Sequence, residues 1–308
     1  MRVRKLLAYT AIYILWGGSF LAIREIVAVV PPFFAAGFRF TLAGFILLIW
    51  SRLTGPISLG PRQLYGASIL GLIMFTCLYA GLFWAEIRIA SGVAAIISAM
   101  IPVWIFAGEV FLLRTQRATA LSLTGIALGF LGVVVLAVHS SRGSAPAHTS
   151  TLAVFVTVAG TICWSAGTLL SRRLALPRPQ KANAGWQMFS GGFLLLILAA
   201  ATGEFRHLPP TAILLSPRVL VSMAYLVVAA SIVAYTAYVW IIAHDSPTRV
   251  SSYAYVNPVF ALILGAAMAG ERLTPLQFAG AAVVLAGVVA TLMGKQKAAT
   301  PTPQPVTR

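Results

Sequence analysis

The sequence predicts an all-α integral membrane protein with ten transmembrane helices. Three observations predict this class: a high apolar content, a scarcity of charge, and a series of long apolar runs. Of the 308 residues, 59% are hydrophobic and only 9% are charged, and the mean hydropathy is +0.92. A soluble domain of this length needs far more charged residues to cover its surface.

The apolar runs are each close to the roughly 20 residues that a helix needs to cross a hydrocarbon core of about 30 Å. They lack the alternation of polar and apolar residues that is typical of barrel strands. The sequence therefore predicts spanning helices. The ten runs cover about residues 6–23, 31–51, 64–85, 92–113, 118–138, 151–171, 184–201, 219–243, 250–269 and 274–293.

The net charge of +16 does not indicate a nucleic-acid partner, because such a partner needs a basic face on a folded domain. Here the cations lie between the runs, fifteen on one side and six on the other, which predicts that both termini are cytoplasmic. The expected inner cations are Arg2, Arg4, Lys5, Arg52, Arg62, Arg114, Arg117, Arg172, Arg173, Arg178, Lys181, Arg249, Lys295, Lys297 and Arg308, and the outer ones are Arg24, Arg88, Arg142, Arg206, Arg218 and Arg272.

An internal repeat is visible when the sequence is shifted against itself by 148 positions, which aligns Trp16 with Trp164 and Gly44 with Gly192. After a short insertion the shift becomes 156, and it then aligns Tyr79 with Tyr235 and Pro102 with Pro258. At a shift of 155 it aligns Gly125 with Gly280. Chance similarity between apolar runs rarely matches Trp, Tyr and Pro in order, so the repeat indicates a duplication.

The repeat divides the chain into a first unit at 1–138, a linker at 139–150, a second unit at 151–293 and a tail at 294–308 that is expected to be disordered. Each unit has five predicted spans, so the second enters the membrane the opposite way up. Inverted repeats are a recurring design of secondary transporters, in which the substrate site lies between the two units near the membrane midplane.

Several motifs resemble the drug/metabolite transporter superfamily, and in particular its EamA-type permeases. They are "LWG" in the first run, "FRF" in the second, "IPVW" and "NPVF" in the fourth and ninth, and "GERLT" before the last. The resemblance covers about residues 5–293 and implies a ten-helix permease with a central cavity, most similar to the amino-acid exporters. One departure is Gln116, where the equivalent position of the second half holds Glu271.

Aromatic residues at mid-depth are the first candidates for the walls of such a cavity. Trp16 and Trp164 are equivalent, and small residues follow each of them, among them Ser19 in the first run. Tyr79 and Tyr235 are also equivalent, with Phe83 and Tyr238 close to one turn further along. Aromatic side chains at this depth either pack within the bundle or line a cavity, and a wet cavity would also supply a partner for a phenol.

Pro102 and Pro258 are expected to interrupt the fourth and ninth helices at matched positions. A proline inside a helix frees a carbonyl, which membrane proteins tolerate beside a watery cavity. Such paired breaks indicate a transport site, with Asn257 adjoining it, but they would also fit kinks that serve packing alone.

Arg39 lies a couple of turns into the second run, where an unpaired cation costs at least ~2.5 kcal/mol. It could capture a substrate carboxylate, or it could be held by Glu25 and carbonyls at a helix end. We prefer the second, structural interpretation, because the resembling family often has arginine here across varied substrates. The equivalent residue of the second half is Gln187.

The predicted function is secondary transport of a small metabolite in the cell inner membrane, with amino-acid export by alternating access as the preferred interpretation. A multidrug or other efflux carrier is the alternative, and a membrane-embedded enzyme or receptor is a third. The loops offer no catalytic set, metal cluster or cofactor motif. Acids are expected only at span ends and in loops, and residues 6–23 contain none, which slightly favours facilitated movement over proton antiport. The sequence leaves open whether the protein is a monomer or a homodimer.

Overall fold

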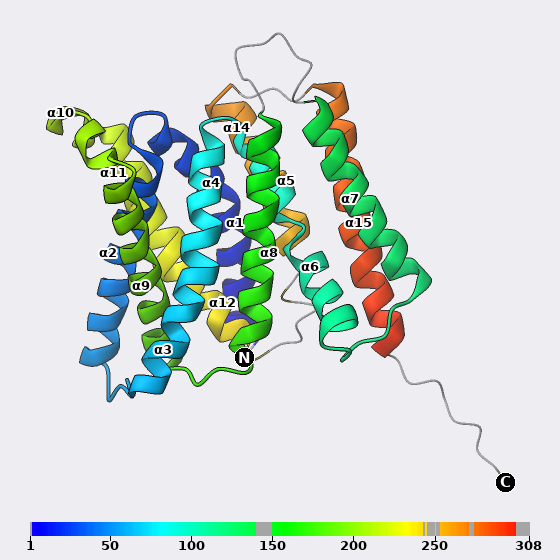
Figure 1. The fold of residues 1–308 in the computed structure, drawn as a ribbon, viewed down its shortest axis with the longest axis horizontal. Helices are drawn as coiled ribbons and strands as arrows, with labels where there is room; N and C mark the ends of the chain where they lie inside the picture. The colour runs from blue at the N-terminus through cyan, green and yellow to red at the C-terminus, as the bar shows by residue number, and fades with distance from the viewer. Residues whose placement is uncertain are drawn as a thin grey trace.

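The structure is a computed structural model that describes residues 2–139, 150–242, 244, 250, 253–270 and 274–299. Within these residues the chain forms a bundle of helices that run roughly parallel to one another (Figure 1). The expectations for Glu271, for residues 140–149 of the linker and for residues 300–308 of the tail lie outside the described residues.

The first half begins with two long helices, α1 (Arg2–Val27) and α2 (Pro32–Leu53). The third apolar run forms α3 (Pro61–Leu70), a π-helical segment η1 (Gly71–Cys77) and α4 (Leu78–Glu86). The fourth run is divided into α5 (Ser91–Ser98), α6 (Ile101–Ala107) and a second π-helical segment, η2 (Gly108–Leu112). The fifth run is α7 (Ala120–His139).

The second half also begins with two long helices, α8 (Thr151–Ser171) and α9 (Gln180–Ala201). Two short helices, η3 (Glu204–His207) and α10 (Thr211–Leu214), lead into α11 (Pro217–Ala224), the π-helical η4 (Tyr225–Val233) and α12 (Ala234–Ile242). The chain is then described again in α14 (Tyr253–Met268) and α15 (Pro275–Ala299).

The last helix, α15, extends past the tenth predicted run. It continues through 294–299, a stretch of Gly, Lys, Gln, Lys, Ala and Ala in which all but the glycine are good helix formers.

Seven helical segments of the described chain are long and apolar enough to cross a membrane, fewer than the ten predicted. Three further apolar helices are shorter and lie at the fifth, ninth and tenth predicted runs, at Ala120–Val135, Val256–Met268 and Phe278–Gly294. The seven are Val3–Val27, Pro32–Leu53, Pro61–Glu86, Ser91–Leu112, Thr151–Ser171, Gln180–Ala201 and Pro217–Ile241.

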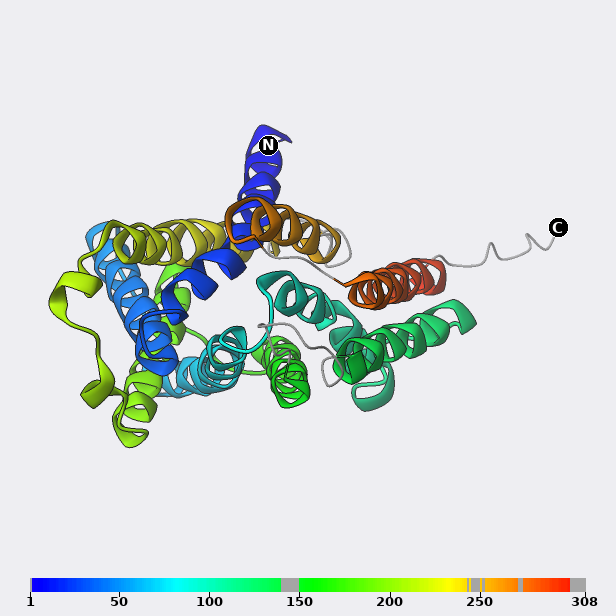
Figure 2. The ribbon, with the colours of Figure 1, turned by 90° about the horizontal axis from the view of Figure 1, so that it is seen from above.

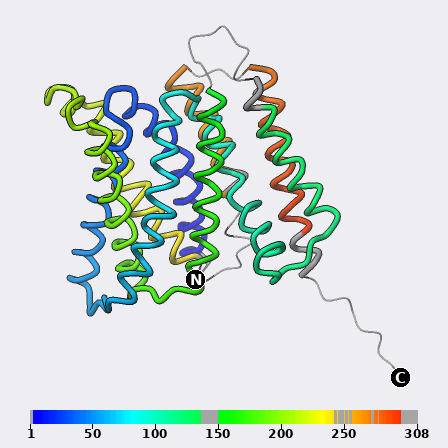
Figure 3. Tube along the Cα trace, in the orientation of Figure 1, coloured from blue at the N-terminus to red at the C-terminus, as the bar shows by residue number. Residues whose placement is uncertain are grey.

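The N-terminal end of α1 and the connections α2–α3, α6–α7 and α8–α9 lie at one end of the bundle, the lower end in Figure 3. Most of the predicted inner cations belong to these segments. At the same end the backbone N–H of Ser58 donates to the carbonyl of Arg178 at 2.8 Å, which ties two of the connections together.

Two pairs of helices approach one another closely at opposite sides of the molecule, α2 with α9 and α7 with α15 (Figures 1 and 2). A methyl group placed on Gly125 would lie 2.4 Å from the backbone N of Thr291, so only glycine fits there. The small residues of α7 therefore pack within the bundle.

The contacts of the α2–α9 pair are reciprocal. A Cβ on Gly37 would lie 2.8 Å from the backbone N of Leu196, and a Cβ on Gly185 would lie 3.1 Å from that of Leu48. Gly37 and Gly185 are 148 positions apart, and so are Leu48 and Leu196, so one contact becomes the other when the halves are exchanged.

The α7–α15 pair shows the same reciprocity at the shift of 155. A Cβ on Gly132 would lie 2.7 Å from the backbone N of Val284, and a Cβ on Gly287 would lie 2.4 Å from that of Gly129. Gly132 is equivalent to Gly287, and Gly129 to Val284. Exchange of equivalent contacts is the property of a two-fold related interface.

The π-helical segments of the third and eighth runs also correspond. Shifting η1 by 156 positions places it on residues 227–233, which lie within η4. π-helical turns are rare and are frequent at functional sites. The space between η1, η4 and α1 is therefore a candidate location for a functional site.

Candidate functional site

A cavity lies between helices of both halves and has mainly aromatic and aliphatic walls. From the first half, residues of α1, α4, α5 and α6 reach it, and from the second half residues of α8 and α14 do. The lining residues are Trp16, Ser19, Phe20, Leu78, Tyr79, Leu82, Ala95, Ser98, Ala99, Ile101, Trp164, Tyr253, Asn257 and Pro258.

The volume of the cavity is about 70 Å³, several times the ~10–15 Å³ that one water molecule needs in the same measure. Among the described residues that line it, none is charged. Its polar groups belong to two serines, two tyrosines, two tryptophans and one asparagine. Apolar walls with a few polar groups are typical of small-molecule sites.

Trp16 is positioned by the small residues that follow it. Its indole N–H donates to the carbonyl of Ala230 in η4 at 3.0 Å, and its ring lies 5.4 Å from that of Tyr253. Gly17 faces α14, where an added Cβ would lie 2.6 Å from Phe260, and Gly18 faces the hydroxyl of Tyr225 at 2.5 Å. The two glycines therefore let neighbouring chain segments approach α1, while the indole is held at the cavity.

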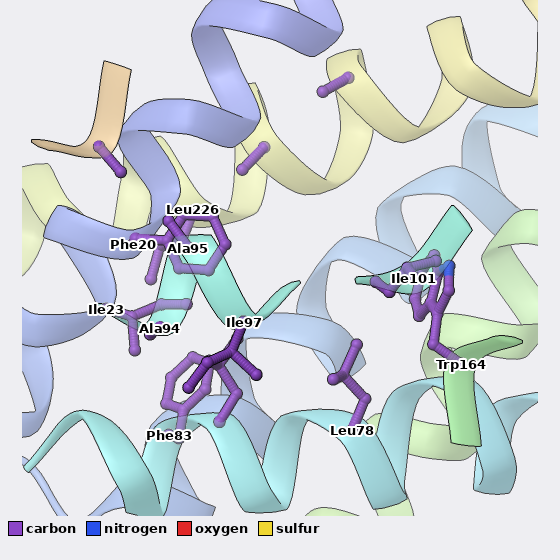
Figure 4. Packing of buried hydrophobic residues seen from close by; sticks show 14 of the residues in the cluster. Phe20, Ile23, Leu78, Phe83, Ala94, Ala95, Ile97, Ile101, Trp164 and Leu226 are labelled. Carbon is purple, nitrogen blue, oxygen red and sulfur yellow. The ribbon is translucent and has the colours of Figure 1, made fainter. Parts of the chain in front are cut away.

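Trp164 and Tyr79 form the aromatic wall on the other side, with their ring centroids 6.3 Å apart. Phe75 of η1 lies behind both, 5.7 Å from Trp164 and 6.1 Å from Tyr79. Figure 4 shows Trp164 directed from α8 toward Ile101 at the start of α6. Trp164 belongs to the buried hydrophobic core and is held firmly in place, whereas Tyr79 is only partly buried and packs against that core.

The fourth run is broken where it meets the cavity, and Pro102 explains the break. Proline has no N–H to donate to the carbonyl four residues earlier, and its ring clashes with that carbonyl. That residue is Ser98, the last residue of α5. The chain turns through Ala99 and Met100 and resumes as α6 at Ile101, so the expected interruption is present.

The ninth run behaves differently, because Pro258 lies inside α14 and the helix continues through it. The expectation of two matched interruptions is therefore wrong for the second half. Pro258 removes the hydrogen bond that an N–H at this position would donate to the carbonyl one turn earlier, but the helix is not interrupted there. Pro258 itself lines the cavity.

Asn257 presents an unused acceptor at the cavity. Its side chain is 7% exposed, and its Oδ1 has no hydrogen-bond partner in the described part of the chain. A buried polar atom without a partner costs free energy, about 1–3 kcal/mol, unless water or a ligand supplies a donor. Oδ1 is therefore prepared to accept a hydrogen bond from a molecule that enters.

Of the candidate residues, the structure brings six to the cavity: Trp16, Ser19, Tyr79, Trp164, Asn257 and Pro258. Five do not line it. Pro102 is buried at the start of α6, and Phe83 is buried with its ring directed toward Ile97 (Figure 4). Tyr235 and Tyr238 lie behind the wall, Tyr235 donating to Oε1 of Gln187 at 3.3 Å and Tyr238 with its ring centroid 5.1 Å from that of Trp16.

The fifth, Arg39, is 2% exposed and donates from Nε to the hydroxyl of Ser231 at 2.9 Å. Its guanidinium lies over two rings, 4.5 Å from the centroid of Phe40 and 5.3 Å from that of Tyr79. Glu25, the partner considered from the sequence, forms an ion pair with Arg218 instead. The expected partner was wrong because Glu25 lies at the end of α1, whereas Arg39 lies deeper in the bundle.

Two acids are also placed differently from the sequence expectation. Glu86 and Glu109 lie near span ends, but they are 0% and 4% exposed. Glu109 pairs with Arg172 across 3.8 Å, between the fourth and sixth runs. The ends of these helices pack inside the bundle, so both carboxyl groups are buried in the protein. The sequence argument for facilitated movement assumed that no acid is buried there, and it therefore no longer holds.

The lining residues that sequence reasoning missed are mostly small or aliphatic ones on α4, α5 and α6, for which no distinctive signal exists. The exceptions are the aromatic residues Phe20, on α1, and Tyr253, on α14, and a spacing signal existed for Tyr253. It precedes Asn257 by four residues, which places both on the same face of a helix. That spacing could have added Tyr253 to the candidates.

A helical bundle with long apolar spans and a cavity between its helices is the architecture of a multi-pass membrane transporter. The sequence pattern of the EamA-like transporter family matches residues 5–138 and again residues 151–293. The chain belongs to this family, within the drug/metabolite transporter superfamily, and is a multi-pass protein of the cell inner membrane.

Two relatives agree with this assignment, and a solved structure shares the fold. The chain is 32% identical over 301 residues to the "Uncharacterized inner membrane transporter YedA" of Escherichia coli (strain K12), covering 96% of this chain and 94% of that one. It is 26% identical to a "Probable amino-acid metabolite efflux pump" of Salmonella typhimurium, covering 92% and 93%. A crystal structure shares the fold with a TM-score of 0.63 at 17% identity, covering 97% of this chain and 100% of that one.

Proposed function

We propose that this protein exports amino acids or closely related small metabolites from the cell. The observation that carries the proposal is the cavity, in which an unused acceptor, Asn257 Oδ1, lies beside aromatic walls. An ammonium group would satisfy Oδ1, and the apolar side chain of an amino acid would pack against Trp16 and Trp164. The printed name of the Salmonella typhimurium relative supports the same substrate class.

The proposal includes ten spanning helices in two inverted repeats, 1–138 and 151–293, with both termini cytoplasmic. The reciprocal contacts of α2 with α9 and of α7 with α15 support two-fold related halves. The corresponding π-helical segments η1 and η4 support it as well. The cation-rich connections at one end of the bundle support the orientation.

Alternating access is the proposed mechanism, with the two halves rocking about the cavity. The break between α5 and α6 supports it, because a discontinuous helix can change its angle without breaking further hydrogen bonds. Substrate would bind in the cavity, in contact with Trp16, Ser19, Tyr79, Trp164 and Asn257.

The test is counterflow in proteoliposomes that contain the purified full-length protein, with labelled amino acids, nucleosides and quaternary cations at two values of pH. We expect saturable counterflow of amino acids. Movement of the quaternary cations alone, dependent on a proton gradient, would instead support a multidrug carrier and contradict the proposal. Counterflow of none of the three classes would contradict transport of all of them.

A pair of variants ties the activity to the cavity. Asn257→Ala removes the unused acceptor and is expected to raise the half-saturating amino-acid concentration about tenfold, as loss of one hydrogen bond to a charged group does. Asn183→Ala is the matched control, because Asn183 lies away from the cavity, where it accepts a hydrogen bond from Gln187 at 2.8 Å. Equal transport by both variants would remove Asn257 from the site.

A further inference from the structure

Arg39 holds an unused donor in the middle of the bundle. Its guanidinium is buried, Nε is occupied by Ser231, and Nη1 has no hydrogen-bond partner within the described ranges. The buried Glu86 stabilises the cation through its field, but it leaves Nη1 unsatisfied. A cation at this depth is costly unless a partner or a ligand meets it. The structural interpretation of Arg39 therefore accounts for only part of this side chain.

Tyr79 lies between this donor and the cavity. The ring of Tyr79 lines the cavity, and the guanidinium of Arg39 lies 5.3 Å from the centroid of the same ring. Arg39 itself does not reach the lining. A rotation of one side chain, Tyr79, would thus join the positive charge to the cavity.

The equivalent place in the second half has no such unused group. Gln187 is equivalent to Arg39, and Tyr235 to Tyr79. The hydroxyl of Tyr235 donates to Oε1 of Gln187 at 3.3 Å, and Nε2 of Gln187 donates to Asn183 at 2.8 Å. Both ends of the Gln187 amide are therefore used, and Tyr235 lies off the cavity. Of these two equivalent pairs of described residues, only Tyr79 and Arg39 combine a cavity-lining tyrosine with an unsatisfied cation behind it.

We propose that Arg39 and Tyr79 form a carboxylate-binding subsite of the cavity. In the structure the ring of Tyr79 covers the subsite, and when substrate enters, the ring turns aside and Nη1 donates to the carboxylate of the substrate. The proposal rests on the proposed function, because it assigns the carboxylate of an amino acid to Arg39 and its ammonium group to Asn257 Oδ1. It predicts that carriage depends on the negative charge of the substrate and that the apolar side chain occupies the aromatic walls.

The subsite is tested by comparing each amino acid with its own α-amide. L-leucine and L-phenylalanine, and the amides of both, compete for counterflow of the labelled amino acid in proteoliposomes held at zero membrane potential. The amide lacks the carboxylate and keeps the ammonium, so the cation of Arg39 repels it. In the wild type we expect the amino acid to compete at least about tenfold better than its amide, as a charge-assisted hydrogen bond provides.

In Arg39→Gln this preference is expected to fall to about onefold, and in Arg39→Lys part of it is expected to remain. Gln187→Ala is the matched control, because it alters the equivalent position and should leave the preference unchanged. The ratio is independent of how much protein folds. Tyr79→Phe preserves the ring that turns aside and should also keep the preference.

The outcomes separate the two proposals. If amino acids exchange in the wild type and Arg39→Gln keeps the full preference for them over their amides, the subsite is wrong and the proposed function stands. If no amino acid exchanges in the wild type, the proposed function is wrong, and the subsite with it. If Arg39→Gln does not fold, Arg39→Lys decides. A preference smaller than that of the wild type supports the subsite, and a preference as large as that of the wild type overturns it.

Discussion

The indole N–H of Trp16 donates a hydrogen bond of 3.0 Å to the backbone carbonyl of Ala230. The bond joins α1 to the π-helical segment η4, and thus connects residues more than 200 positions apart in the chain. Because the same indole lines the cavity, one side chain both holds two helices together and forms part of the candidate site. A change at Trp16 should therefore affect stability and transport together.

Trp16→Phe retains an aromatic ring but removes the donor. The carbonyl of Ala230 loses its partner, at a cost of ~1–3 kcal/mol, so we expect a lower Tm in detergent and a several-fold lower rate of counterflow. Trp50→Phe is the control, because the side chain of Trp50 is 44% exposed and lies away from the cavity. A Trp16→Phe protein with the Tm and the counterflow rate of the wild type would show that this hydrogen bond contributes to neither stability nor transport.

Gly192→Ala should separate α2 from α9. The added Cβ would lie 2.3 Å from the backbone N of Thr41, which cannot move without shifting α2. Overpacking of this kind costs ~1–3 kcal/mol, so we expect a clear fall in Tm. Gly60→Ala is expected to have little effect, since its nearest neighbour would be Gln63 at 3.6 Å. Equal Tm values for the two variants would show that the close approach of α2 and α9 does not contribute to stability.

Pro102→Ala should restore the hydrogen bond that the fourth run lacks. With an N–H at this position the carbonyl of Ser98 regains a partner, and α5 and α6 can join into one helix. We expect an unchanged or higher Tm and slower counterflow, because the break faces the cavity. Pro258→Ala should change the rate less, since α14 already continues through Pro258. Equal rates in both variants would argue against a role of the break.

Glu204→Ala should destabilise the start of α2. The two carboxylate oxygens of Glu204 accept from the backbone N–H groups of Phe33 and Phe34, at 3.3 and 2.7 Å, in the first turn of that helix. Loss of a helix cap costs ~0.5–2 kcal/mol, and Glu204→Gln, which keeps one acceptor, should cost less. Thermal melting in detergent measures the effect of both variants. We expect the lowest Tm for Glu204→Ala, an intermediate Tm for Glu204→Gln and the highest Tm for the wild type.

The sequence was a good guide to the helices and to several cavity residues. Hydropathy locates the helices well because a chain in lipid must satisfy its backbone within each span. Trp16, Tyr79 and Trp164 were found because large polar-tipped rings are unusual at mid-depth, and matched positions in a repeat make them stand out. Pro102 marked a real break because the loss of a backbone donor is a local effect.

The remaining features depend on contacts that no local pattern reveals. Pro258 is matched to Pro102 in sequence, but α14 continues through Pro258, whereas the fourth run is broken before Pro102. Phe83 lies close to one turn from Tyr79 in α4, and Tyr238 lies close to one turn from Tyr235 in α12, yet both side chains pack in the core. The partner of Arg39, Ser231, is 192 positions away.

The reciprocal contacts of α2 with α9 and of α7 with α15 have a consequence for assembly. Each contact surface on the first half matches the equivalent surface on the second half, and the second matches the first in return. Such a surface is complementary to itself after rotation by half a turn. Two copies of a single five-helix unit, inserted in opposite orientations, would therefore be able to form both of these helix–helix contacts.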